Sequence, residues 1–238
     1  MKKIIIIGAT SGIGRELALC YIKAGHKVGI TGRRNELLDE LKHQYPLQTE
    51  TECFDVTGNA NIKHLENLIQ KPGGMDVFVY NSGTADIHKE VDMQNEMTTT
   101  KTNVLGFVET TVYAFNYFSK QGHGQIAATS SVASQRGNGW APSYSASKAY
   151  MSNYLEGLTI KAYRLKRNIS ITDIQPGFVN TKMAKGDGQF WVAEPGEAAH
   201  QIFKAIEKRK RRVFVTKRWA LMAWLMRNVP FFIYRKMG

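Results

Sequence analysis

Residues 3–14 read KIIIIGATSGIG, in which four consecutive isoleucines are followed by three glycines within seven residues. A short run of β-branched residues is typical of a strand buried on both faces, and the glycines allow a tight turn into a helix. The stretch therefore predicts a strand, a turn and a helix in direct succession. The apolar run is shorter than the roughly 7–15 residues that a signal peptide needs, so we expect a cytoplasmic protein.

The same alternation of strands and helices extends outward from this stretch. Further strands are expected at 27–32, 51–56, 76–81, 124–130, 170–175 and 212–216, and helices at 12–24, 34–44, 59–70, 93–119, 145–166 and 196–208. Such alternation indicates βαβ units and a parallel sheet with helices on both faces. We predict one α/β domain over residues 1–216, a Rossmann-like, doubly wound sheet of about seven strands. A C-terminal amphipathic and apolar tail is predicted over 217–238.

Composition excludes several classes of protein. Of the 238 residues, 43% are hydrophobic, which is enough for one well-filled domain. The two cysteines have no CxxC spacing and the six histidines are scattered, so we expect neither a disulfide framework nor a metal site. The net charge of +12 is concentrated in residues 207–238, which hold ten Lys or Arg and one acid. A basic tail of this kind does not indicate a nucleic-acid-binding domain.

The three glycines of the turn, Gly8, Gly12 and Gly14, follow the first strand directly. Glycine permits close backbone approach, and the helix that follows would point its N-terminal amides at a pyrophosphate. The spacing is GxxxGxG rather than the general dinucleotide pattern GxGxxG. Its place after the first strand of an alternating chain favours dinucleotide binding over a simple turn.

The end of the second strand carries Arg33 and Arg34 where an NAD site would place an acidic residue for the ribose 2′-hydroxyl. A guanidinium group binds a phosphate through two hydrogen bonds, and a cation at a helix start is not favoured by the helix dipole. A bound anion would remove that conflict. The sequence therefore predicts NADP(H) as the cofactor.

The sequence YSASK at 144–148 places a phenol and an amine four residues apart, 13 residues after Ser131. On a helix, Tyr144 and Lys148 would share one face. A nearby ammonium group favours the phenolate, so the pair suits proton transfer near neutral pH. Taken alone, such a pair is more often a chance pair on a helix surface.

Five motifs now stand in order: GATSGIG, YNSG at 80–83, Asn103, the Ser131–Tyr144–Lys148 spacing and PG at 176–177. In this combination the chain resembles the short-chain dehydrogenase/reductase family over about residues 3–216. Ser82 replaces the family's usual alanine, and Ile7 stands where many members have threonine. The change at Ser82 is small, and Ile7 should matter little because the phosphate contacts are expected from backbone amides.

The resemblance implies roles for individual residues. Tyr144 would donate or accept the proton, Lys148 would hold the nicotinamide ribose and lower the tyrosine pKa, and Ser131 would bind the reacting oxygen. Asn103 would kink its helix and anchor a water-linked proton path. The cofactor-binding residues implied in this way, together with the arginines above, are Gly8, Thr10, Ser11, Gly12, Ile13, Gly14, Arg33, Arg34, Asp55, Val56, Asn81, Ser82, Gly83, Tyr144, Lys148, Pro176, Gly177, Val179 and Thr181.

The substrate is expected beneath residues 182–195, within the segment 178–195 that has the weakest secondary-structure pattern and reads as a long functional loop. Phe190 and Trp191 in this loop suit a lid over an apolar substrate, and a loop packed back on its own domain or on a neighbouring subunit is the alternative. Gln135 and Trp140 are predicted to line the other wall, with Ser131 and Tyr144 at the reacting oxygen.

The tail has two interpretations. Residues 219–226 are apolar on all sides but are too few to span a bilayer, which needs about 20 residues. Basic residues with Trp and Phe suggest peripheral contact with anionic lipid. Alternatively, the tail is buried between subunits of a homodimer or homotetramer.

These observations favour an NADPH-dependent oxidoreductase that reduces an apolar or acyl-linked ketone or aldehyde, a small-molecule carbonyl substrate, with tyrosine as the proton donor. An alcohol-oxidising NAD(P)-dependent dehydrogenase would use the same residues in reverse. A non-enzymatic dinucleotide-sensing or scaffold protein is a third alternative, and the complete set Asn103, Ser131, Tyr144 and Lys148 argues against it.

Overall fold

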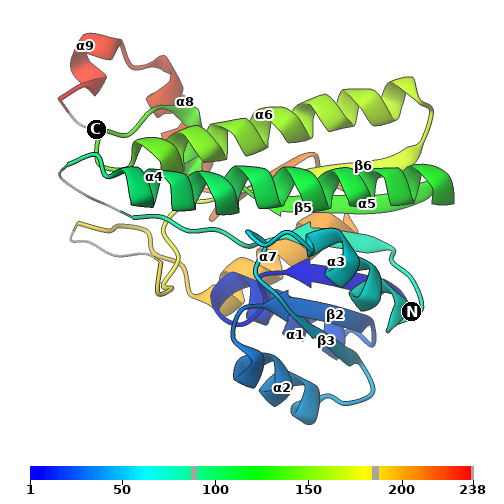
Figure 1. The fold of residues 1–238 in the computed structure, drawn as a ribbon. Helices are drawn as coiled ribbons and strands as arrows, with labels where there is room; N and C mark the ends of the chain where they lie inside the picture. Colours follow the sequence, from blue (N-terminus) through cyan, green and yellow to red (C-terminus); the bar gives the residue numbers. More distant parts are fainter. Residues whose placement is uncertain (87–89, 184–187, 237–238) are drawn as a thin grey trace.

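The seven strands form one parallel sheet in the order β3-β2-β1-β4-β5-β6-β7 (Figure 1). The computed structural model describes residues 1–86, 90–183 and 188–236. The strands are β1 Lys3–Ile7, β2 Lys27–Gly32, β3 Thr49–Cys53, β4 Val77–Tyr80, β5 His123–Thr129, β6 Asn168–Pro176 and β7 Arg212–Val215. The predicted Rossmann-like, doubly wound α/β sheet of about seven strands is confirmed.

Helices follow the strands in chain order. They are α1 Gly12–Lys23, α2 Asn35–Gln44, α3 Asn61–Gln70, α4 Met93–Thr100, the π-helical η1 Lys101–Gly106, α5 Phe107–Gln121, the 3-10 turn η2 Val132–Gln135, α6 Pro142–Arg164, α7 Pro195–Glu207, α8 Trp219–Asn228 and α9 Phe231–Tyr234.

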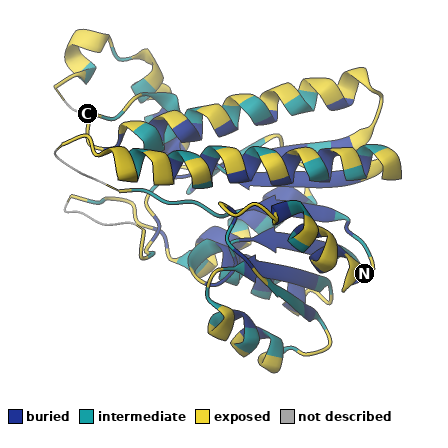
Figure 2. Cartoon of the chain, in the orientation of Figure 1, coloured by how far each residue is buried: buried dark blue, intermediate teal, exposed yellow. Residues whose placement is uncertain are grey.

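The core lies in two layers on the two faces of the sheet. Alternate isoleucines of β1 point to opposite faces, since successive side chains of a strand do so. Ile4 and Ile6 pack among buried residues of α1, α2 and α7, while Ile5 and Ile7 pack among those of α3, α5 and α6. Figure 2 shows the buried residues gathered on the sheet and on the helix sides that face it. Burial on both faces explains why β1 is an unbroken apolar run.

Two segments differ from the sequence-based expectation. The third strand begins at Thr49 and ends at Cys53, earlier than the expected 51–56, because the Asp55 carboxylate accepts a hydrogen bond from the Thr57 amide at 2.9 Å and turns the chain. The long helix expected at 93–119 is interrupted by η1, which contains Asn103. A π-helical turn of this kind is common at functional sites.

The C-terminal segment forms two short helices, α8 and α9. Helix α8 packs on η2 through Trp219 and Ala223, which form a small cluster with Val132. Within the described residues, the structure contains no helix with the length and apolar character needed to cross a membrane. The boundary at residue 216 stays a prediction, and residues 237–238 lie outside the described part of the tail.

Candidate active site

The sequence-predicted site residues gather at the carboxyl ends of four adjacent strands. Gly8 follows β1, Asn81 follows β4, Ser130 and Ser131 follow β5, and Gly177 follows β6. Strand order reverses between β1 and β4, and ligands of open α/β sheets bind at such a switch point. The fold therefore brings together residues as far apart in the chain as Gly8 and Gly177, which are separated by 169 positions.

The glycine turn has a geometry that other residues would strain. Gly8 and Gly12 have φ values of +85° and +57°. A Cβ added to Gly14 would overlap the carbonyl oxygen of Gly8. The turn is tied to β2, because the amide of Gly8 donates to the Thr31 carbonyl at 3.0 Å. This backbone leaves room for a ligand to approach the main chain closely.

The start of α1 is suited to an anion. Its N-cap, Ser11, has an extended backbone and makes no side-chain cap to the helix among the described residues, so the first-turn amides face outward. The Arg34 guanidinium lies beside this turn and donates to the Thr10 hydroxyl at 2.6 Å and the Ser11 hydroxyl at 2.8 Å. Together these groups form a positively polarised cradle. Ile13 follows within the same first turn.

Arg33 lies beside this cradle. Its guanidinium is 3.6 Å from the Asp55 carboxylate, and the Arg33 side chain is 72% exposed. An exposed ion pair of this kind contributes little to stability, because solvent screens it. The Arg33 guanidinium is therefore accessible from solvent and only weakly held by this carboxylate. Val56, buried beside Asp55, forms part of the core behind it.

Asn81 connects three strands at the site. Its amide nitrogen donates to the Gly8 carbonyl at 3.0 Å, and its amide oxygen accepts from the Thr129 hydroxyl at 3.0 Å. The next two residues are close to other site groups. Ser82 lies against Gly8, and a Cβ added to Gly83 would come within 3.3 Å of the Lys148 ammonium nitrogen. The segment 81–83 thus links the glycine turn to the predicted catalytic lysine.

Tyr144 and Ser131 meet through their hydroxyl groups, which are joined by a hydrogen bond. Burial raises the pKa of Tyr144 above its ordinary value, and the hydrogen bond with Ser131 opposes that rise. The sequence predicted a pKa lowered by Lys148. In the structure the burial effect is larger, so Tyr144 keeps its proton at neutral pH.

Lys148 is almost fully buried one helical turn from Tyr144, and its ammonium nitrogen is 5.7 Å from the centre of the Tyr144 ring. The ammonium donates to the Thr129 carbonyl at 2.8 Å. Burial lowers the pKa of Lys148 to about 8, and the charge of Asp173 acts in the opposite direction. A lysine with this pKa carries its positive charge at neutral pH and loses it in mildly basic solution.

Asn103 is fully buried in η1 and joins two neighbouring segments. Its amide group makes two hydrogen bonds of 2.9 Å with the backbone of Thr84. The Asn103 amide also donates to the Ser147 hydroxyl at 3.0 Å, and Ser147 in turn donates to the Tyr144 carbonyl at 2.7 Å. The helix irregularity that the resemblance implied is present, and it is coupled to the helix that carries Tyr144.

The segment after β6 borders the same space. The Ser131 hydroxyl lies 3.4 Å from the Pro176 carbonyl oxygen, to which it donates. Val179 pairs with Ala193, which brings the two ends of the 178–195 segment together. The Thr181 methyl group lies 3.1 Å from where a Cβ on Gly12 would stand. This segment therefore crosses from the serine side of the site to the glycine turn.

The two loop aromatics predicted to cover the substrate are packed on other rings. Phe190 lies 5.1 Å, and Trp191 5.8 Å, from the ring centre of Trp219 in α8. Phe178 completes the cluster at 5.5 Å from Trp219. Trp219 covers Gly177, where an added Cβ would overlap the indole ring. Residues 184–187 of the predicted lid lie outside the described residues.

The other two residues predicted to contact the substrate are Gln135 and Trp140. The Gln135 amide nitrogen donates to the Gln175 amide oxygen at 3.0 Å, so this group is already hydrogen-bonded within the protein. Trp140 is about half exposed near the start of α6. The structure thus brings Ser131 and Tyr144 into direct contact and leaves Trp140 on the surface.

Comparison with known proteins decides the family. The model of the family described as short chain dehydrogenase matches residues 2–190 of this chain. The chain belongs to the short-chain dehydrogenase family. It is an NAD(P)-dependent oxidoreductase of class EC 1.1.1.-.

Individual relatives of this short-chain dehydrogenase agree with that assignment. A protein named dehydrogenase/reductase SDR family protein 7-like from Dictyostelium discoideum is 29% identical, with 96% of this chain and 78% of that protein aligned. Sorbose reductase sou1 from Schizosaccharomyces pombe is 29% identical over 76% of this chain and 74% of the relative. The crystal structure of a short-chain dehydrogenase from Streptomyces avermitilis has a TM-score of 0.80 at 24% identity, covering 94% and 92% of the two chains.

The residues of this short-chain dehydrogenase fit a dinucleotide. A side chain at Gly14 would press on the Gly8 carbonyl and distort the turn, and the first-turn amides of α1 supply the donors that a pyrophosphate requires. Such a cofactor would supply hydride chemistry when bound, and the protein would orient it and handle the proton.

Two residues of this short-chain dehydrogenase, Asp173 and Trp219, were not predicted from sequence to belong to the site. Asp173 is buried in β6 and accepts hydrogen bonds from the Ser130 hydroxyl at 2.5 Å and the Ser152 hydroxyl at 2.6 Å. A signal existed, since an acidic residue in the middle of the predicted strand SITDIQ requires partners when buried. Trp219 was visible only as part of an apolar tail, and no local pattern indicates that it reaches Gly177.

Proposed function

We propose that the protein is an NADPH-dependent reductase that converts an apolar or acyl-linked ketone or aldehyde to an alcohol. The observation that carries the proposal is the hydrogen-bonded pair Ser131 and Tyr144 beside the buried Lys148. Two adjacent hydroxyl groups, each able to donate a hydrogen bond to a bound substrate, suit an oxygen that gains negative charge in the transition state.

Each side chain has a defined task in this proposal. Ser131 and Tyr144 bind the substrate oxygen, and Tyr144 transfers its hydroxyl proton to that oxygen as the carbon receives hydride. The positive charge of Lys148 stabilises the phenolate that remains. Asn103 holds η1 against α6 through Ser147, which keeps Tyr144 at a fixed height above the sheet.

Reduction is proposed over oxidation because the paired arginines favour a phosphorylated cofactor, and NADPH usually drives reduction. Tyr144 would act as the proton donor in that direction. Alcohol oxidation would use the same residues in reverse. The name of the sorbose reductase relative also supports reduction. An apolar substrate, rather than a sugar, is proposed from the rings of Phe178, Phe190 and Trp191.

NADP(H) is proposed over NAD(H) because two arginines stand at the end of β2. Arg34 is held beside the glycine turn by the hydroxyls of Thr10 and Ser11, and Arg33 is exposed next to it. A 2′-phosphate would complement both charges through paired hydrogen bonds. No acidic residue occupies the positions 32–34 for a free 2′-hydroxyl.

A homodimer or homotetramer in the cytoplasm is proposed as the working form. Exposed apolar side chains on η1, α5 and α6 support an oligomer: Leu105, Val112, Tyr150, Ile160 and Tyr163. Two unpaired cysteines, Cys20 and Cys53, support a reducing compartment. The C-terminal segment 217–238 is proposed to make peripheral contact with a membrane surface, and no nucleic-acid partner is proposed.

The proposed function is tested by NADPH oxidation against a panel of apolar ketones, aldehydes and acyl thioesters, with NADH and a sugar ketone in parallel. We expect turnover of an apolar carbonyl with NADPH and weak turnover with NADH. NAD⁺-dependent oxidation of the matching alcohols, with no reduction of any carbonyl at neutral pH, would replace the proposal with the dehydrogenase alternative. Dinucleotide binding without turnover in either direction would favour a sensing or scaffold role.

A further inference from the structure

The inner face of α8 is already occupied by the catalytic domain. Trp219 is 5% exposed and Ala223 is 3% exposed, and both pack against Val132 in η2. Trp219 also covers Gly177 at the end of β6. This face is therefore part of the folded structure, and the helix is not a loose extension.

The outer faces of α8 and α9 are apolar as well. Leu221 and Trp224 in α8 are 60% and 61% exposed, and Leu225 adjoins them at a spacing that places the three on one side of the helix. Phe231, Phe232 and Ile233 follow, exposed, in α9. Large apolar side chains gathered in this way on a surface mark an interaction site. We call these six residues the tail patch.

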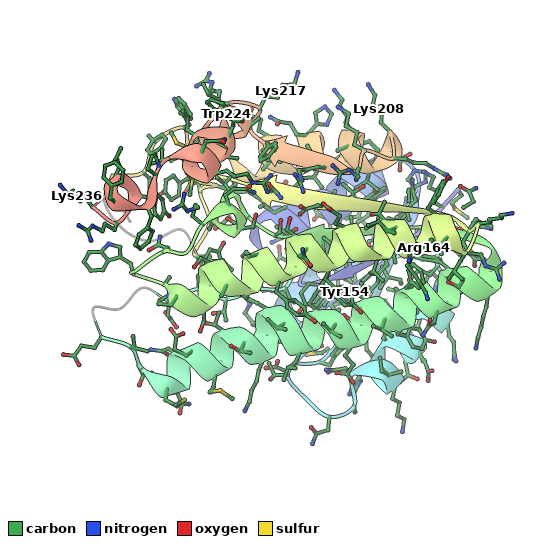
Figure 3. The ribbon with its side chains drawn as sticks, turned by 90° about the horizontal axis from the view of Figure 1, so that it is seen from above. Tyr154, Arg164, Lys208, Lys217, Trp224 and Lys236 are labelled. Carbon is green, nitrogen blue, oxygen red and sulfur yellow. The ribbon has the colours of Figure 1, made fainter. Side chains whose placement is uncertain are left out.

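The charges around the tail patch have one sign. Residues 217–238 contain five Lys or Arg and no Asp or Glu, and the basic run 208–212 precedes them. Figure 3 shows Lys208, Lys217 and Trp224 along the edge of the molecule formed by β7 and α8, with Lys236 beyond them. Apolar rings interspersed with cations match the headgroups and acyl boundary of an anionic bilayer.

The two helices are held in place next to the catalytic residues. The Arg136 guanidinium donates to the carbonyls of Met226 at 3.1 Å and Val229 at 2.8 Å, and it lies 4.5 Å from the Tyr234 ring centre. The Tyr234 hydroxyl donates to the Gly137 carbonyl at 2.8 Å. These contacts join α8 and α9 to the chain directly after η2, so the tail patch is presented by a fixed surface.

We propose that α8 and α9 dock the protein on the surface of an anionic lipid bilayer through the tail patch. The aromatic cluster around Trp219 lies on the inner side of α8, opposite the tail patch. Docking would therefore place the substrate side of the site next to the membrane, with α8 between the two. The carbonyl substrate would then be a lipid-soluble molecule that arrives from the bilayer. Only this substrate class rests on the proposed reductase function, and the docking itself does not.

A second copy of the chain is a poorer occupant of the tail patch. A two-fold contact would place the same surface on both partners, and each copy would bring five cations and no acid from residues 217–238. Like charges facing each other disfavour such an interface. Lipid phosphates supply the opposite charge together with an apolar layer for the rings.

Vesicle flotation tests this proposal with the full-length protein. The vesicles contain phosphatidylcholine either alone or mixed with phosphatidylglycerol, and binding is measured at low and high salt. The test variant combines Lys217→Gln, Trp224→Ser and Arg227→Gln. The matched control combines Lys23→Gln, Leu47→Ser and Lys63→Gln, which removes two exposed cations and one exposed apolar side chain from the α1–α3 part of the domain, away from the tail patch.

We expect the wild type and the control to float with the phosphatidylglycerol vesicles. The test variant should bind at least roughly 25-fold more weakly, because each of the two removed cations contributes about a fivefold factor near an anionic surface and the loss of Trp224 adds to this. Equal binding by both variants, or no binding by the wild type, would overturn the proposal. So would a sedimentation mass that falls in the test variant alone without vesicle binding, which would assign the tail patch to a second copy. NADPH oxidation measured in parallel separates a failure of docking from a failure of the reductase function.

Discussion

The cofactor side and the substrate side of the site are built on the same sheet edge by different means. Around Gly8, Gly12 and Gly14 the backbone itself forms the binding surface, and its shape is determined by residues adjacent in sequence. Around Tyr144 and Trp219 the surface consists of side chains drawn from η2, α6, the loop after β6 and the tail. A binding surface made of backbone should lose its shape when a Cβ is added to one of its glycines. A surface made of side chains should lose its packing when one of those side chains is truncated. The following predictions use that difference.

Removal of the indole ring is expected to have the largest effect on stability. Trp219→Ala leaves a cavity against Gly177 and Val132, and truncation of a buried aromatic costs about 3–5 kcal/mol. Urea unfolding should show that loss in the free energy of unfolding. Trp224→Ala on the exposed side of the same helix should change it by about 0.5 kcal/mol or less. Equal losses in both variants would mean that α8 does not pack through Trp219.

Addition of one methyl group at Gly14 should impair the cofactor side. Its Cβ would overlap the Gly8 carbonyl, and overpacking of this kind costs about 1–3 kcal/mol, so we expect Gly14→Ala to weaken NADPH binding about five- to hundredfold. Isothermal titration calorimetry measures the effect. Gly157→Ala is the control, because an added Cβ there meets no atom within 4 Å. If Gly14→Ala bound NADPH with wild-type affinity, the glycine turn would not be the surface that binds the cofactor.

Cofactor choice is expected to depend on the paired arginines. Arg33→Ala and Arg34→Ala should each raise the KM for NADPH about tenfold, since a hydrogen bond to a charged group contributes roughly 1.5–3 kcal/mol. The KM for NADH, which lacks the 2′-phosphate, should change little and serves as the internal control. If the KM for NADH rose as much as the KM for NADPH, the arginines would support the glycine turn and would not bind the 2′-phosphate.

The smallest expected effect is on the pH dependence of turnover. The pKa of Lys148 is about 8, and the negative charge of Asp173 raises it. Arg212 faces Asp173 from β7, with its Nε 3.5 Å from the carboxylate. Asp173→Asn removes the negative charge and leaves Arg212 with Glu156 as its ion-pair partner at 3.8 Å, so the pKa of Lys148 should fall further. The loss of reductase activity with rising pH should therefore begin at lower pH than in the wild type.

The control for that experiment keeps the charge of Asp173. Ser152→Ala removes one of its hydrogen bonds and should lower stability without moving the pH profile. A profile that moves equally in both variants, or in neither, would mean that Asp173 acts on packing alone.

Most of the fold and the central residues of the site could be predicted from sequence, because they are encoded locally. An unbroken run such as IIII is compatible with a buried strand, and Tyr144 and Lys148 share a face by helical spacing alone. Asp173 could not be placed in the same way, because its partners Ser130 and Ser152 come from other elements. The contact between Trp219 and Gly177 joins positions 42 residues apart. Such contacts depend on tertiary packing, which no local pattern contains.

The central claim is that the Tyr144 hydroxyl delivers the proton to the substrate oxygen. Tyr144→Phe removes only that hydroxyl, and loss of a general acid typically costs about 10²- to 10⁴-fold in rate. We predict a fall of this size in kcat/KM for carbonyl reduction, with NADPH affinity unchanged and with Tyr150→Phe, exposed on the same helix, behaving as wild type. Wild-type turnover by Tyr144→Phe would contradict the account.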